Sequence, residues 1–238
     1  MIRNFFVIAN WKMNGSLSFV HQISSFVEEW KEIKDIALSQ SSVHIKIVIC
    51  PPYLYIPSLH DIIASLNLDI IYLGAQNCSE HESGSYTGEI STEILKEFGC
   101  SYVILGHQER KKIYENNDII MKKIEIAKKY DIAPIQCIND HDIQNKVALS
   151  GDIIAYEPTK YIGAAECESI DKISSTIQLI KSTYITQEYG KKVVYGGAVN
   201  SDNIRPLYQI TSLDGVLVGR SSLNYKEFTK LLYGIIRA

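Results

Sequence analysis

Short apolar runs rich in β-branched residues recur along the chain. The runs that predict strands are Phe5–Ala9, His44–Cys50, Ile70–Ala75, Tyr102–Leu105, Ala133–Ile138, Ile153–Tyr156, Lys192–Tyr195 and Gly215–Val218. They are nearly all apolar rather than alternating, which is typical of parallel strands that are covered on both faces.

Longer segments with apolar residues at spacings of three or four lie between several of these runs, and this spacing predicts helices. Those segments are Ser16–Ile36, Asn117–Tyr130, Ser169–Glu188 and Leu223–Ile236. Strands that alternate with helices pair in parallel through crossover connections. Eight such units in 238 residues favour a closed (β/α)8 barrel, which typically needs about 250 residues. We therefore expect an α/β protein with one domain over residues 1–238.

The first turn also argues against an open nucleotide-binding sheet. Such a sheet would carry a glycine-rich turn after its first strand. The chain has Asn10-Trp11-Lys12-Met13-Asn14-Gly15 there, with a single glycine. A dinucleotide cofactor is therefore not indicated.

Composition excludes several other classes. A net charge of −3 and a pI near 6.1 argue against nucleic-acid binding, which needs a basic surface. No apolar run approaches the roughly 18 residues of a membrane span, and the first residues lack the pattern of a signal peptide. Five cysteines without a CxxC pair indicate neither a disulfide framework nor a metal site. We expect a cytoplasmic protein with reduced thiols and no metal.

Polar residues follow the predicted strands where each strand stops. Asn10 and Lys12 follow the first strand, His107 follows the fourth, and Glu157 closes the sixth. Glycine turns follow the seventh and eighth. Active sites of such barrels lie at the carboxyl ends of the strands. Taken alone, the lysine could be a solvated charge, the histidine a structural residue and the glycines a turn; together they favour an active site on one rim.

The residues at these places resemble one known family. The matching stretches are Ala9-Asn10-Trp11-Lys12-Met13-Asn14-Gly15, Gly74-Ala75-Gln76-Asn77, Tyr86-Thr87-Gly88-Glu89-Ile90-Ser91, Ile104-Leu105-Gly106-His107, Ala155-Tyr156-Glu157-Pro158, Tyr195-Gly196-Gly197 and Asp214-Gly215-Val216-Leu217-Val218-Gly219. In these motifs, and along essentially its whole length, the chain resembles the triosephosphate isomerases. The resemblance implies an enzyme that interconverts dihydroxyacetone phosphate and D-glyceraldehyde 3-phosphate through an enediolate, as part of glycolysis and gluconeogenesis.

The resemblance also implies the roles of individual residues. Glu157 corresponds to the family's catalytic base, and His107 to the neutral imidazole that polarises the substrate carbonyl. Lys12 corresponds to the cation beside the substrate, Asn10 to the donor at the enediolate oxygen, and Glu109 to the acid that pairs with the lysine. The reaction of the family needs no cofactor.

The phosphate of the substrate is expected on backbone N–H groups at a helix N-terminus. The residues that the resemblance places there are Gly197, Ala198 and Gly219, with Arg220 beside them and Gly163 reaching over from a lid. The lid corresponds to Pro158–Ser169, and its closure would exclude water. The segment Gln76–Glu89, with Thr87 near its tip, resembles the loop that inserts into a partner subunit. We therefore expect a homodimer.

Several residues near the expected site depart from the family pattern. The departures are Gln108 in place of serine, Thr159–Ala165 in place of Val-Trp-Ala-Ile-Gly-Thr-Gly, Ala198 in place of serine, Arg220 in place of glycine, and Asn139-Asp140 in place of Gly-Glu. They leave two alternatives open. One is an isomerase for a four-carbon ketose phosphate, and the other is a sugar-phosphate binding protein with weak activity.

Overall fold

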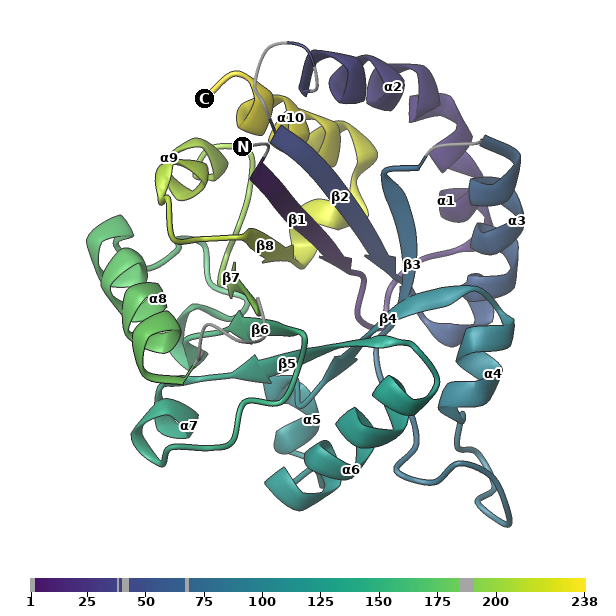
Figure 1. Ribbon diagram of the computed structural model, residues 1–238. Coiled ribbons are helices and arrows are strands. Elements are labelled where there is room, and N and C mark those ends of the chain that lie inside the picture. Colours follow the sequence, from purple (N-terminus) through teal and green to yellow (C-terminus); the bar gives the residue numbers. More distant parts are fainter. Residues whose placement is uncertain (1–2, 38, 40–42, 67–68, 185–190) are drawn as a thin grey trace.

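The computed structural model describes residues 3–37, 39, 43–66, 69–184 and 191–238. Eight parallel strands pair in sequence order, and β8 returns to β1, so that the sheet closes into a barrel (Figure 1). The strands are β1 (Arg3–Asn10), β2 (Val43–Cys50), β3 (Ile71–Ala75), β4 (Cys100–Leu105), β5 (Ala133–Ile138), β6 (Ile153–Tyr156), β7 (Lys192–Gly196) and β8 (Gly215–Val218). The expected (β/α)8 architecture is confirmed.

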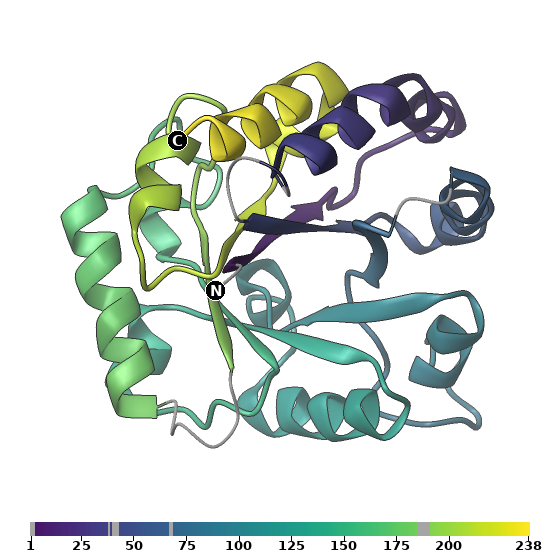
Figure 2. The same ribbon diagram turned by 45° about the horizontal axis from the view of Figure 1, so that its top comes forward.

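Helices surround the sheet on its outside, as Figures 1 and 2 show from two directions. The α-helices are α1 (Leu17–Gln22), α2 (Val27–Ile36), α3 (Ile56–Leu66), α4 (Thr92–Glu97), α5 (Gln108–Lys111), α6 (Asn117–Lys129), α7 (Asp140–Gln144), α8 (Ile170–Tyr184), α9 (Ile204–Gln209) and α10 (Tyr225–Ile236). Short 3-10 segments are η1 (Ile23–Phe26), η3 (Tyr53–Tyr55), η4 (Thr159–Tyr161) and η6 (Arg220–Leu223). In the described part of the chain, no helix combines the length and apolarity needed to cross a membrane.

The continuous apolar character of the strands follows from two separate cores. One core lies between the sheet and the helices. The other fills the inside of the barrel and consists of Phe6, Ile8, Val48, Cys50, Ile104, Ile135, Cys137, Ile153, Ala155, Val194 and Leu217. Successive side chains of a strand point to opposite faces, so each strand supplies both cores.

The same alternation determines which polar residues reach the inside of the barrel. Residues two apart along a strand share a face. Phe6 and Ile8 of β1 point inward, and Asn10 is the next residue in that series. Ile153 and Ala155 of β6 point inward, and Glu157 follows them. Both polar side chains therefore lie at the carboxyl rim, over the inner core.

The first expected helix is wrong as a single element. The segment Ser16–Ile36 is interrupted by η1, and α2 begins after Phe26, which has φ −108° and ψ 1°. Ser24 and Ser25 lie in this interruption, and serine side chains compete for backbone hydrogen bonds inside a helix. Phe26 still packs on Tyr225 of α10, with ring centroids 5.4 Å apart.

The start of the last expected helix also differs. The last helix does not include Leu223, which belongs to η6, because Asn224 caps α10 by accepting from the backbone N–H groups of Lys226 and Glu227. The third expected helix is present as α8, and its expected end at residues 185–188 lies outside the described residues.

Candidate active site

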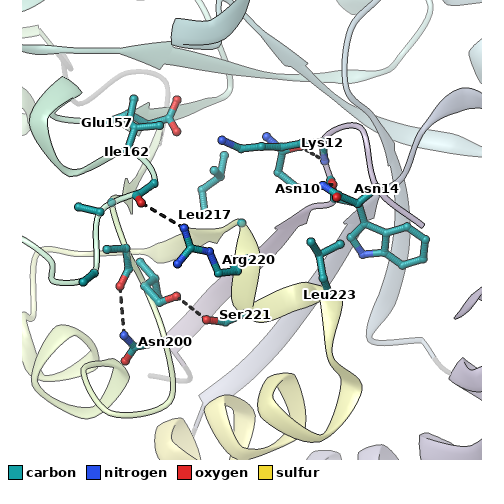
Figure 3. A pocket seen from close by; sticks show the side chains of 18 residues that line it. Asn10, Lys12, Asn14, Glu157, Ile162, Asn200, Leu217, Arg220, Ser221 and Leu223 are labelled. Atoms are coloured by element: carbon teal, nitrogen blue, oxygen red, sulfur yellow. Dashed lines mark hydrogen bonds between the residues drawn. The ribbon is translucent and has the colours of Figure 1, made fainter. Parts of the chain in front are cut away.

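A cavity of about 440 Å³ opens at the carboxyl ends of the strands, under the segment after β6 (Figure 3). The candidate residues that line it are Asn10, Lys12, Glu157, Gly163, Gly197, Ala198, Gly219 and Arg220. Figure 3 shows Glu157 and Asn10 on different sides of this space, and Arg220 extending between them from the loop after β8. The cavity thus gathers residues from four strand ends that lie far apart in the sequence.

Glu157 and His107 form a buried pair behind this cavity. Oε1 of Glu157 lies 3.3 Å from Nε2 of His107, and the two side chains are only 3% and 5% exposed. Among the described residues, neither Nε2 of His107 nor Oε2 of Glu157 has a hydrogen-bond partner. Buried polar atoms without partners are costly, and they are found where a ligand completes the bonding. The pair is therefore positioned to act on a bound molecule.

The local backbone determines which nitrogen of His107 carries the proton. His107 is the N-cap of α5, and its Nδ1 accepts a hydrogen bond of 3.2 Å from the backbone N–H of Glu109. Only an unprotonated Nδ1 can accept this bond. Burial lowers the pKa of His107, whereas the carboxylate of Glu157 raises it, with a net increase. The cap bond opposes that increase, and it favours a neutral ring with its proton on Nε2, facing Glu157.

The pKa of Glu157 lies below its ordinary value. Burial raises this pKa, but the interactions of the carboxylate with His107, with the Cys137 thiol and with the cation of Lys12 together outweigh burial. A carboxylate with a lowered pKa is ionised at neutral pH. Glu157 can therefore accept a proton without first losing one.

Lys12 is held in an unusual backbone conformation. Its φ is 54°, in the left-handed region that residues other than glycine seldom occupy. Its N–H donates to Oδ1 of Asn10 at 3.0 Å, and its carbonyl accepts from Nε2 of Gln76 at 2.9 Å. Its ammonium group pairs with Glu109 at 2.5 Å. Because Oδ1 of Asn10 is engaged in this way, the amide N–H groups of Asn10 are left as donors toward the cavity.

The turn after β7 also has left-handed backbone. Ala198 has φ 48°, and its carbonyl accepts from Nδ2 of Asn203 at 2.9 Å. Gly197 has no room for a side chain, since a Cβ there would lie 2.5 Å from the hydroxyl oxygen of Tyr195. Arg220 is not among the described residues with positive φ, so the backbone after β8 accepts a residue other than glycine without strain.

Thr87 lies away from the cavity, whereas His107 and Glu109, which do not line it either, contact the lining residues Glu157 and Lys12. Thr87 is exposed on the loop between β3 and α4, which projects beside α6 in Figure 1. Glu80 and Glu82 of this loop pair with Lys122 and Lys129 of α6. The loop is therefore fixed to its own barrel at its base, while Thr87 faces outward.

Sequence reasoning missed the side chains that support the site from behind. Gln76 holds the Lys12 carbonyl, and Oε1 of Gln108 accepts from Nδ2 of Asn139 at 2.7 Å. The Nε2 atom of Gln108 is buried with no partner among the described residues. Gln76 directly follows a strand, and this position could have indicated a role at the site. The contact between Gln108 and Asn139 joins two distant segments, and no sequence pattern predicts it.

A buried carboxylate next to an imidazole, with a lysine and backbone turns around the same cavity, can transfer protons and hold an anion. At the carboxyl rim of a (β/α)8 barrel, this arrangement defines an acid–base enzyme for a small anionic substrate. In the described part of the chain, no three His, Cys, Asp or Glu side chains gather as metal ligands.

Comparison with known proteins identifies the family within this class. A family model described as triosephosphate isomerase matches residues 5–235. Two similar relatives are named triosephosphate isomerase. The one from Wolbachia sp. subsp. Brugia malayi (strain TRS) is 36% identical, and the match covers 99% of each chain. The one from Wolbachia pipientis wMel is 38% identical, and the match covers 96% of this chain and 93% of that one. A crystal structure of triosephosphate isomerase from Bartonella henselae superposes with a TM-score of 0.76 at 25% identity, covering 96% of this chain and 98% of the other. The chain belongs to the triosephosphate isomerase family.

Proposed function

We propose that this chain interconverts dihydroxyacetone phosphate and D-glyceraldehyde 3-phosphate, with Glu157 as the base that moves the proton. The observation that carries the proposal is the buried pair of His107 and the cavity-lining Glu157, in which Nε2 of His107 and Oε2 of Glu157 have no hydrogen-bond partner among the described residues. Family membership supports a small sugar phosphate as the substrate.

Proton transfer between neighbouring carbons needs one base within reach of both. Glu157 takes the proton from the hydroxyl-bearing carbon of the ketose, and the bonding electrons move toward the carbonyl oxygen to give an enediolate. The same carboxyl group returns the proton to the adjacent carbon, while the hydroxyl proton moves from the first oxygen to the former carbonyl oxygen, so that the aldose forms. The lowered pKa of Glu157 keeps it ionised for the first step.

The negative charge of the enediolate develops on the two substrate oxygens. Nε2–H of His107, the amide of Asn10 and the ammonium group of Lys12 are the donors for these oxygens. Donors that are already fixed in place need no rearrangement as the charge develops, so they stabilise the transition state more than the ground state. The hydrogen bonds of Asn10 and Gln76 to Lys12 serve this fixation, and Glu109 positions the Lys12 ammonium.

The phosphate of the substrate is assigned to the backbone N–H groups of Gly163, Gly197, Ala198, Gly219 and Arg220. All five residues border the cavity, Gly163 from the segment after β6 and the others from the turns after β7 and β8. The segment 158–169 acts as the lid that excludes water during the reaction.

A coupled assay of the purified protein tests this function. Glu157→Gln keeps the size of the side chain but removes the base, so kcat should fall by about 1,000-fold or more while KM changes little. Glu125→Gln, an exposed substitution on α6, is the matched control and should keep the wild-type rate. Wild-type turnover equal to that of Glu157→Gln would contradict the proposal. A strong preference for a four-carbon ketose phosphate would show that this longer sugar phosphate is the substrate instead.

We further propose a homodimer that uses the side of the barrel around β1–β4. The apolar side chains exposed in the loops after these four strands support it: Met13 (96% exposed), Leu54 (87%), Tyr86 (45%) and Ile113 (74%). Exposed apolar groups in neighbouring loops are typical of an interface. The loop 76–89 would then carry Thr87 toward the partner's site.

Sedimentation of two matched variants tests the dimer. Leu54→Glu should convert the dimer to monomer, because it would bury a charge in the interface. Leu179→Glu makes the same change at an exposed leucine on α8, on another side of the barrel, and should leave the dimer intact. A wild-type protein that sediments as a monomer would contradict the proposal.

We also infer a single catalytic domain over residues 1–238, which the closed pairing of β1 with β8 supports. A cytoplasmic location is proposed from the five free cysteines, which suit a reducing compartment.

A further inference from the structure

Arg220 occupies a position where a long cationic side chain reaches across the cavity. It is the first residue of η6, directly after Gly219 at the end of β8, and its side chain is exposed. Figure 3 shows the guanidinium extending from this loop toward the segment that contains Ile162. The side chain therefore spans from the barrel to the lid.

The guanidinium makes a direct contact with the lid. Nη2 of Arg220 donates to the carbonyl oxygen of Gly163 at 3.2 Å, between residues 57 apart in the chain. Gly163 has φ +74°, and a Cβ there would meet no atom within 4 Å. The glycine is therefore needed for its backbone conformation rather than for space, and that conformation turns its carbonyl to the arginine.

The central part of the lid has few other attachments. Within the described residues, the contact from Arg220 is the one side-chain hydrogen bond that reaches Ile162–Ala165. At the start of the lid, Asn139 donates to the hydroxyl of Thr159 at 3.4 Å. Arg220 is thus the main polar link between the middle of the lid and the barrel.

Arg220 is also a cation without a counter-ion. Among the described residues no carboxylate pairs with it, whereas the ammonium group of Lys12 lies 2.5 Å from Glu109. A guanidinium has five N–H donors, and the contact to Gly163 uses one of them. The remaining donors border the same cavity as Gly197, Ala198 and Gly219. They are available for an anion, and guanidinium bonds to phosphate are strong because both partners are charged.

We propose that the Arg220 side chain is a lid latch that holds Gly163 through one N–H group and the substrate phosphate through others, so that phosphate binding and lid docking are coupled. The substrate is that of the function proposed above. The latch uses a side chain where the family pattern has glycine, and it provides an attachment for a lid whose own sequence departs from that pattern.

Two aldose substrates provide a kinetic test of the latch. D-Glyceraldehyde 3-phosphate carries the phosphate, and D-glyceraldehyde lacks it. In Arg220→Ala the ratio of kcat/KM for the phosphorylated to the unphosphorylated aldose should fall by about tenfold to a hundredfold, the effect of losing a hydrogen bond between charged groups. Arg220→Lys keeps the charge but not the forked donors, and the ratio should fall by less. Arg205→Ala removes the same charge from an exposed position on α9 and should leave the ratio unchanged. An unchanged ratio in Arg220→Ala would overturn the proposal.

Amide hydrogen exchange tests the latch without any turnover. Inorganic phosphate at saturation should slow exchange of residues 159–166 in the wild type and in Arg205→Ala, and most of this slowing should be lost in Arg220→Ala. Equal slowing in Arg220→Ala, or none in the wild type, would overturn the latch. Slowing that depends on Arg220 in a protein with no isomerase activity would overturn the proposed function and leave the latch standing.

Discussion

The two sides of the cavity differ in how firmly their residues are held. On the side of the acid–base pair, Glu157 and His107 are almost fully buried, and Lys12 is fixed by hydrogen bonds at both its N–H and its carbonyl. On the side of the lid, Ile162–Ala165 lie over the cavity with one described side-chain hydrogen bond to the barrel. The chemistry therefore depends on atoms that packing fixes, whereas the covering of the site depends on a few polar contacts.

This difference explains where the chain departs from the family pattern. The proposed proton-transfer residues Asn10, Lys12, His107 and Glu157 match it, whereas the lid and the turns beside it carry most of the changes. A segment with few contacts accepts substitution at a lower energetic cost than a close-packed one. The changes in the lid then call for a different attachment, and Arg220 is placed to supply it.

Substitution of His107 should reduce activity more than substitution in the lid, because His107 belongs to the buried and firmly held side of the cavity. His107→Gln removes the imidazole donor, and kcat/KM should fall by about 100- to 1,000-fold. Without the imidazole, burial becomes the dominant influence on the Glu157 carboxyl group, and burial raises the pKa of that group. The acid limb of the pH profile of kcat/KM should therefore move to higher pH.

The control for this prediction is His21→Gln, at an exposed position on α1, which should keep both the rate and the profile. An acid limb that stays in place or moves to lower pH in His107→Gln would show that the imidazole does not hold the pKa of Glu157 down.

Substitution of Gly163 should have a smaller effect, confined to the lid. Gly163→Ala meets no atom but must adopt φ +74°, and a left-handed residue costs about 1–2 kcal/mol. If that strain is relieved by undocking the lid, kcat/KM should fall by about five- to thirtyfold. The melting temperature should change little, because the strain is relieved locally.

Lys160→Ala is the control in the same lid, since Lys160 is exposed and outside the cavity lining. It should change kcat/KM by less than about twofold. A drop in the melting temperature of Gly163→Ala with full activity would place the strain in the barrel rather than in the lid.

The architecture and the rim residues could be predicted from the sequence for physical reasons. Strands covered on both faces are continuously apolar, so each strand end is visible as the point where polar residues begin. Asn10 and Glu157 stand at such points, and the alternation of side chains directs both inward.

The remaining features depend on contacts between distant segments. Phe26, where the first helix is interrupted, packs on Tyr225 of α10, and the tautomer of His107 depends on the cap of a four-residue helix. The hydrogen bond from Arg220 to Gly163 joins two loops, and the sequence does not show that these loops lie close together. Such contacts become visible only when the barrel is closed.

The most direct test of the central claim is a crystal structure with phosphoglycolate, an anionic mimic of the enediolate. We expect its carboxylate within hydrogen-bond distance of Nε2 of His107 and the amide of Asn10, beside Glu157, with its phosphate on the side of Gly197 and Arg220. A ligand bound elsewhere, or one that occupies the cavity with its carboxylate away from His107 and Glu157, would contradict a single site shared by these residues.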